Sequence, residues 1–142
     1  MSILQRQLSS MTYVDSSAFF AIISPSDKNH QAAVATWLEL GKKREHLVIS
    51  HYVMIETITL LHARLGAAAV EKYLGDIQPV IEVVWAEVGS HVAAVTAMLA
   101  HPGKGGPSLV DCMSFEVIRE RRITDVFTYD RHFDGHGFRI IG

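Results

Sequence analysis

Short apolar segments alternate with longer amphipathic segments along almost the whole chain. The short segments are typical of buried strands and span residues 12–15, 47–49, 80–85, 126–128 and 138–141. The longer segments show helical periodicity and span residues 16–23, 28–42, 52–65, 67–74, 87–99 and 108–121. Such alternation predicts an α/β domain in which helices cover both faces of a mostly parallel sheet.

The chain is long enough for one domain with its own core, since it has 142 residues of which 49% are hydrophobic. We expect this domain to span residues 11–142. Residues 1–10 are interpreted either as a small N-terminal appendage or as the product of an upstream start, with Met11 as the working initiator. The longest apolar run, residues 18–23, is too short to span a membrane. The absence of a secretory signal and the single cysteine, Cys112, predict a cytoplasmic protein.

The formal net charge of −2 argues against the class of nucleic-acid-binding proteins whose whole surface is strongly basic. Local basic patches remain compatible with this charge. The candidates are residues 42–44 and the arginines at 119, 121 and 122, although each group also fits a solvated helix end.

Four acidic residues lie inside or at the end of apolar stretches, namely Asp15, Glu56, Asp111 and Asp130. No lysine or arginine occurs within three residues of the first three, and a buried ionised carboxylate is costly without a counter-charge. Each acid also has an ordinary interpretation. Asp15 and Asp130 fit helix caps or turns, Asp111 fits a capping box with Ser108, and Glu56 fits a hydrogen-bonded structural residue. A single bound cation would account for all four together.

The chemistry that suits such a cluster is hydrolysis of a phosphodiester bond. Asp15 and Asp130 directly follow predicted strands, and ligands collect at the carboxyl ends of parallel strands. Carboxylates are the ligands that Mg²⁺ and Mn²⁺ prefer, and these ions activate water and stabilise a leaving oxygen. The sequence therefore predicts a metal-dependent enzyme that needs no covalent nucleophile.

Four motifs carry these acids in a fixed order. Asp15 lies in the motif Val-Asp-Ser-Ser-Ala at 14–18, and Glu56 lies in the helical segment 52–61. Asp111 ends the motif Pro-Ser-Leu-Val-Asp at 107–111, and Asp130 lies in the closing segment 123–138. In this order the motifs resemble those of the PIN-domain nucleases, and specifically the VapC-like toxin ribonucleases of toxin–antitoxin systems. The resemblance covers residues 11–141.

The resemblance implies a three-layer α/β/α sandwich and an acidic pocket that binds Mg²⁺, with Mn²⁺ as an alternative. It implies Asp15 and Asp111 as the most direct metal ligands, with Glu56 and Asp130 completing the shell or orienting the water. Two hydroxyls, those of Ser17 and Thr128, are expected to support the site by hydrogen-bonding a carboxylate or a substrate phosphate. Local capping is the alternative role of both.

The function implied by the resemblance is that of an endoribonuclease toxin, homodimeric and neutralised by a small antitoxin. Apolar positions on the predicted helices 28–42 and 52–65 are the candidate antitoxin contacts. Members of the family often carry a further acid where this chain has the glycine-rich segment 103–106, so a fifth acidic ligand is not expected.

Two alternative functions remain open from the sequence. The domain fits a non-catalytic module that binds RNA or protein, although its intact acids argue against this. Asp15 also has the position of the nucleophile in aspartyl-phosphate phosphatases, but these enzymes typically need an acid where this chain has Ser17.

Overall fold

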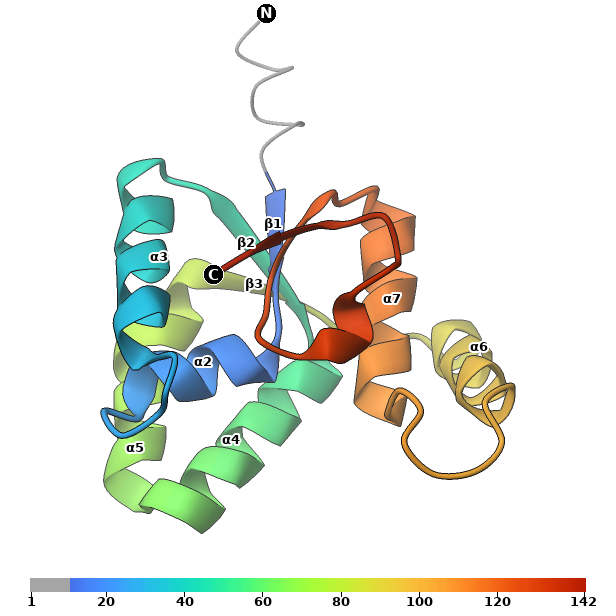
Figure 1. Cartoon of the computed structure of the whole chain (residues 1–142), viewed down its shortest axis with the longest axis horizontal. Helices are drawn as coiled ribbons and strands as arrows, with labels where there is room; N and C mark the ends of the chain where they lie inside the picture. Colours follow the sequence, from blue (N-terminus) through green and yellow to red (C-terminus); the bar gives the residue numbers. More distant parts are fainter. Residues whose placement is uncertain (1–10) are drawn as a thin grey trace, which may run out of the picture.

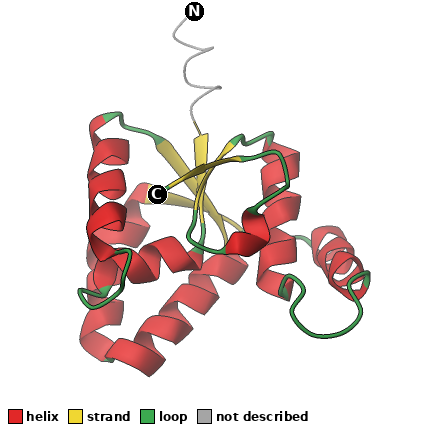
Figure 2. Cartoon of the chain, viewed as in Figure 1, coloured by secondary structure: helices red, strands yellow, loops and turns green. Residues whose placement is uncertain are grey.

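The computed structural model describes residues 11–142 of the chain. The predicted appendage or upstream start, residues 1–10, lies outside the described residues. A five-stranded parallel sheet runs through the described part in the order β3-β2-β1-β4-β5, which confirms the predicted sheet (Figures 1 and 2). The strands are β1 (Met11–Val14), β2 (His46–Ser50), β3 (Ile81–Val84), β4 (Asp125–Phe127) and β5 (Arg139–Ile141).

Helices lie on both sides of the sheet, so that the predicted three-layer α/β/α arrangement is confirmed (Figure 1). The helix α3 lies on one side and α7 on the other, while α6 packs against the outside of α7. The α-helices are α2 (Ser16–Ile23), α3 (His30–Lys42), α4 (His51–Leu65), α5 (Ala67–Lys72), α6 (Val88–Leu99) and α7 (Leu109–Arg121). Shorter turns are η1 (Tyr73–Ile77), η2 (Gln78–Val80) and η3 (Arg131–Phe133).

The core lies between the sheet and the helices that cover it. The central strand β1 is buried over Tyr13 and Val14, and its neighbours contribute the buried side chains of Val48 and Phe127. Buried strands of a parallel sheet are apolar on both faces, as these are. Within residues 11–142, no helix combines the length and the hydrophobicity needed to cross a lipid bilayer.

Two helices differ from the prediction. The helix α3 begins at His30 because the side chain of Asp27 accepts a hydrogen bond from the backbone N–H of Asn29 at 2.8 Å and forms a turn there. Leu38 of this helix is 58% exposed. The second difference follows α5, where the chain continues into a π-helical turn (η1) instead of breaking at Gly75.

The hydroxyl of Tyr13 joins three elements beneath the carboxyl edge of the sheet. It donates a hydrogen bond to Ser114 Oγ of α7 at 2.6 Å and accepts one from the backbone N–H of Ser50, at the end of β2, at 3.3 Å. Tyr13 is fully buried, and burial raises the pKa of its hydroxyl to about 12. The group therefore stays neutral and protonated over the whole working range of pH.

We expect Tyr13→Phe to lower the free energy of unfolding by about 1–3 kcal/mol, because the buried N–H of Ser50 loses its acceptor and the hydroxyl of Ser114 loses its donor. Tyr73→Phe is the matched control, since the hydroxyl of Tyr73 is buried without a hydrogen-bond partner in the described part of the chain. Its removal is expected to be neutral or stabilising. Urea denaturation of both variants measures the difference, and equal destabilisation would contradict this account of Tyr13.

Candidate active site

The register between β1 and β4 brings two of the predicted acids to one edge of the sheet. Val14 pairs with Phe127, so the residues that follow, Asp15 and Thr128, lie side by side. The backbone N–H of Asp15 donates to the carbonyl of Phe127 at 3.0 Å and extends the pairing by one residue. Asp130 follows Thr128 by two positions and therefore reaches the same edge.

Asp15 is the most deeply buried of the four acids, with 2% of its surface exposed. It caps the N-terminus of α2, and its Oδ2 accepts hydrogen bonds from Ser17 Oγ at 2.7 Å, Thr128 Oγ1 at 3.1 Å and Ser17 N at 3.3 Å. Burial, helped by the negative charges of Asp111 and Asp130, nevertheless raises the pKa of Asp15 to about 6. The hydroxyls of Ser17 and Thr128 thus contact a carboxylate, as predicted.

Both supporting hydroxyls also accept hydrogen bonds from backbone N–H groups. Ser17 Oγ accepts from the N–H of Tyr129 at 2.9 Å, and Thr128 Oγ1 accepts from the N–H of Asp130 at 2.9 Å. For Thr128 the carboxylate contact and the local backbone contact, predicted as alternatives, therefore occur together, whereas Ser17 binds the backbone of a distant segment. As a result, the start of α2 and the segment after β4 are fastened to each other around Asp15.

Glu56 reaches the site from α4 and is half-buried. The hydroxyl of Ser16 donates a hydrogen bond to its Oε1. Burial raises the pKa of Glu56, and the charges of Asp111 and Asp130 act in the same direction. These electrostatic effects show that the acid from α4 shares one neighbourhood with the acids from α7 and η3.

Asp111 combines the two interpretations that its sequence context offered. It forms a capping box at the start of α7, in which the N–H of Ser108 donates to Asp111 Oδ2 at 3.0 Å and the N–H of Asp111 donates to Ser108 Oγ at 3.1 Å. Burial raises the pKa of Asp111, and the negative charge of Asp130 acts in the same direction. The hydrogen bond from the N–H of Ser108 lowers the pKa but does not cancel this rise. The cap fixes the carboxylate at the helix end that faces the other acids.

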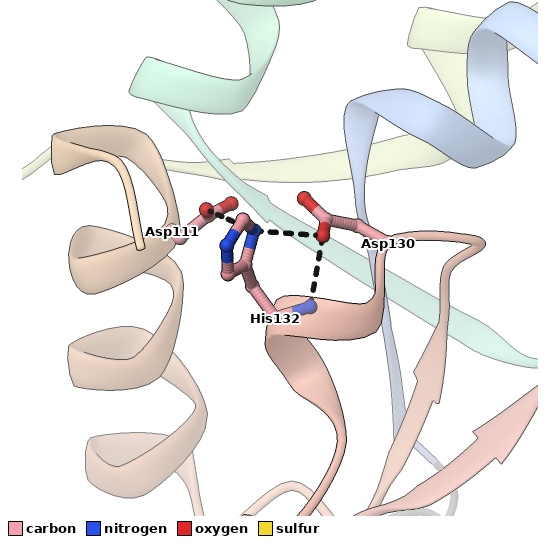
Figure 3. Close-up of side chains that lie close together, drawn as sticks. All are labelled: Asp111, Asp130 and His132. Carbon is pink, nitrogen blue, oxygen red and sulfur yellow. Dashed lines mark hydrogen bonds and ion pairs between the residues drawn. The ribbon is translucent and has the colours of Figure 1, made fainter. Parts of the chain in front are cut away.

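His132 lies between Asp111 and Asp130 (Figure 3). Its Nδ1 is 3.0 Å from Asp130 Oδ1 and 3.7 Å from Asp111 Oδ2, and one ligand atom from each of the three residues lies within 4.8 Å of the others. Its Nε2 is 3.0 Å from the carbonyl oxygen of Gly105. The pKa of His132 is raised, first by that carbonyl and then by the two carboxylates. The ring therefore has an acceptor at each nitrogen, which favours the imidazolium form.

Sequence reasoning did not single out His132 as a site residue. The available signal was its place two residues after Asp130, because Asp130 caps the turn η3 by accepting from the N–H of His132 at 2.9 Å. The contact of His132 with the carbonyl of Gly105 places the glycine-rich segment 103–106 beside the pocket. The predicted ranking of Asp15 and Asp111 as the most direct ligands stays a prediction.

The residues that gather here fit a divalent cation by charge and by donor type. Within residues 11–142, no lysine or arginine forms an ion pair with any of the four carboxylates, and His132 is the one cationic partner. Asp111, Asp130 and His132 offer two oxygens and one nitrogen at ligand spacing, and Asp15 and Glu56 add further negative charge nearby. Hard oxygen donors with this excess of negative charge are typical of sites for Mg²⁺ or Mn²⁺.

Residues 12–138 match the PIN domain family. The chain belongs to this family. The protein described as the 23S rRNA-specific endonuclease VapC20, from two strains of Mycobacterium tuberculosis, is 30% identical over 129 residues, which cover 90% of this chain and 95% of the relative. Nucleases with PIN domains use divalent metal ions, in agreement with the acidic cluster.

Solved structures agree with this assignment. The crystal structure of M. tuberculosis VapC20, described as a sarcin-ricin loop cleaving toxin, superposes with a TM-score of 0.77 at 26% identity, over 89% of this chain and 95% of that one. FitAcB from Neisseria gonorrhoeae gives 0.64 at 13% identity, covering 93% and 97% of the two chains. VapBC2 from Rickettsia felis, bound to a DNA fragment from their promoter, gives 0.63 at 11% identity, covering 92% and 96%. The last two show the fold alone.

The raised pKa of Asp15 predicts how stability depends on pH in the absence of metal. Because its pKa is about 6 when folded and 3.8 ordinarily, the folded state binds more protons between these values, and stability falls as the pH rises through them. We expect Asp15→Asn to stabilise the protein in EDTA at pH 7.5, by on the order of 2 kcal/mol, and to lose this advantage near pH 4. Urea denaturation at the two pH values measures it.

The matched control is Asp125→Asn, which removes a carboxylate from the amino end of β4, where it pairs with Arg139 at the surface. This variant should not stabilise the protein at pH 7.5. A gain for Asp15→Asn of the same size at both pH values would contradict the assigned cause.

Proposed function

We propose that this protein is a metal-dependent endoribonuclease of the VapC-like toxin type, with Mg²⁺ as the working ion and Mn²⁺ as a substitute. The observation that carries the proposal is the convergence of Asp15, Glu56, Asp111, Asp130 and His132 at the carboxyl edge of a PIN domain. RNA is the proposed substrate, and the 23S rRNA-specific relative makes ribosomal RNA the first class to test.

Each site residue has a role that follows from its contacts. Asp111 and Asp130 would hold the cation, and His132 would join them through Nδ1 only after losing the proton that this nitrogen carries in the metal-free site. Asp15 would add its Oδ1, which has no hydrogen-bond partner among residues 11–142. A divalent cation bound there supplies charge neutralisation at the phosphate and a lowered pKa for the attacking water. Glu56, held through one oxygen by Ser16, would use its other oxygen to orient that water and accept its proton.

The supporting hydroxyls would act through Asp15. Ser17 and Thr128 both donate to Oδ2, which leaves the opposite carboxylate oxygen to face the site. Ser17 also occupies the position where a phosphatase of the aspartyl-phosphate type needs an acid, and it hydrogen-bonds Asp15 there. This contact favours a positioned ligand over a covalent nucleophile.

We expect Asp15→Ala to abolish metal-dependent RNA cleavage, lowering the rate by at least about 100-fold, because the variant removes a charge that no neighbour replaces. The control is Asp125→Ala, at the amino end of β4 and therefore away from the carboxyl ends of the strands. This variant should cleave like the wild type. Cleavage is followed on total RNA with Mg²⁺, and the cut ends are then mapped. A wild-type protein that binds RNA without cutting it would instead support the non-catalytic alternative.

The partners we propose are a small antitoxin and a second copy of the chain. The helices α3 and α4, predicted as antitoxin contacts, expose Leu38 and Ile55 respectively. Leu38 lines a hollow with the apolar side chains of Trp37 and Val80, whereas its charged lining residues are of both signs. An antitoxin segment that presents apolar side chains therefore fits there.

The homodimer is proposed to form through α6. Val88, Val92 and Leu99 are exposed and recur at the spacing of one helical face. Several exposed aliphatic side chains on one face of a helix are typical of a surface that another protein covers. We expect Val92→Glu to convert a dimer into a monomer, as measured by size-exclusion chromatography with light scattering. The control Gln31→Glu, at an exposed polar position of α3, should leave the dimer intact.

A further inference from the structure

One row of side chains on α4 runs past the acidic site. Tyr52, Glu56, Leu60 and Arg64 follow one another at four-residue intervals and form a ridge along the helix. The first three line a mostly apolar hollow of about 430 Å³, and the last two line a second hollow of about 270 Å³. Since Leu60 borders both hollows, the ridge connects them.

The second hollow contains acids of the site and one positive charge. Asp15, Ser17 and Asp130 line it on one side, and Arg64 lines it from α4. Arg64 is the one cationic side chain among the residues that line this hollow. A polyanionic substrate that enters this hollow therefore meets one guanidinium group beside the acids.

The guanidinium group of Arg64 is held in place but is not neutralised. Its Cζ lies 5.4 Å from the centre of the Phe20 ring, a cation–π contact with α2, which lies beside α4 (Figure 1). Within residues 11–142 no carboxylate forms an ion pair with it, although Asp27 lines the same hollow. Asp27 instead accepts a hydrogen bond from the N–H of Asn29. The five donors of Arg64 are thus available to an external anion.

The position of Arg64 along the helix indicates which anion it would meet. Eight residues separate it from Glu56, which corresponds to about 12 Å along the helix axis. The two helix positions are far enough apart for Arg64 to meet a phosphate of the same strand other than the one that Glu56 faces.

We propose that Arg64 forms a subsite for a backbone phosphate of the RNA strand, next to the phosphodiester that the acidic site cuts. The subsite rests on the proposed ribonuclease function. It adds to that function the path of the RNA strand, which leaves the acids along α4 toward Phe20. Arg64 is a positioning residue here. It aligns the strand and takes no part in proton transfer.

Binding is tested apart from cleavage, in a Glu56→Gln background that keeps the RNA intact. The probe is a fluorescent single-stranded RNA that the wild-type protein cuts, with Mg²⁺ present. Adding Arg64→Ala is expected to raise the Kd about 10-fold and to reduce the slope of log Kd against log salt concentration by about 0.7. Arg64→Lys should recover part of the loss, because it restores the charge without the planar group.

The matched control is Arg122→Ala. Arg122 is exposed, has no ion pair in the described residues and lies at the end of α7 remote from Asp111. It also belongs to the basic patch considered from the sequence, so a larger effect of Arg122→Ala than of Arg64→Ala would overturn the proposal in favour of that patch.

A neutral methylphosphonate placed at single positions beside the cut identifies the phosphate itself. At the phosphate that Arg64 contacts, the effects of the modified RNA and of Arg64→Ala should not add, whereas at other positions they should. Additive effects at every position would overturn the subsite while leaving cleavage by the wild type, and hence the proposed function, standing. A wild-type protein that cuts no RNA would overturn both.

Discussion

Parallel pairing of β1 with β4 is the contact on which the site depends. The pairing of Val14 with Phe127 decides that Asp15 lies beside Thr128 and that Asp130 reaches the same edge. A slip of one residue in this register would turn the alternate side chains of β1 toward the opposite layer and separate Asp15 from Thr128. The central position of β1, paired on both sides, makes such a slip costly.

Three of the four acids begin helical segments and line the site at the same time. Asp15 caps α2, Asp111 closes a capping box on α7, and Asp130 caps η3. The ordinary and the functional interpretations of these residues are therefore compatible. Helix N-termini also direct positive dipole ends toward the cluster, and this lowers the cost of holding several carboxylates together. The raised pKa values of Asp15 and Asp111 show that the cost is not removed.

Much of the fold followed from the sequence, because burial on both faces of a parallel sheet leaves continuous apolar segments and helices between them. The four acids were equally visible, since an unpaired carboxylate in an apolar segment stands out. His132 and Arg64 were not identified, because their positions depend on contacts between distant elements. His132 reaches Asp111 only through the turn η3, and Arg64 meets Phe20 only because α4 lies beside α2. The exposure of Leu38 likewise depends on how α3 is rotated against the sheet.

The hydroxyl of Tyr13 has a consequence beyond stability. It lies two residues before Asp15, bonds Ser114 one turn after Asp111, and receives the N–H of Ser50, the residue that caps the helix carrying Glu56. Three of the four acids are thus attached to elements that meet at a single buried atom. Relative movement of these elements would have to break hydrogen bonds inside the core. The spacing of the carboxylates is therefore as rigid as the core beneath them, even though the loops around the site are open to solvent.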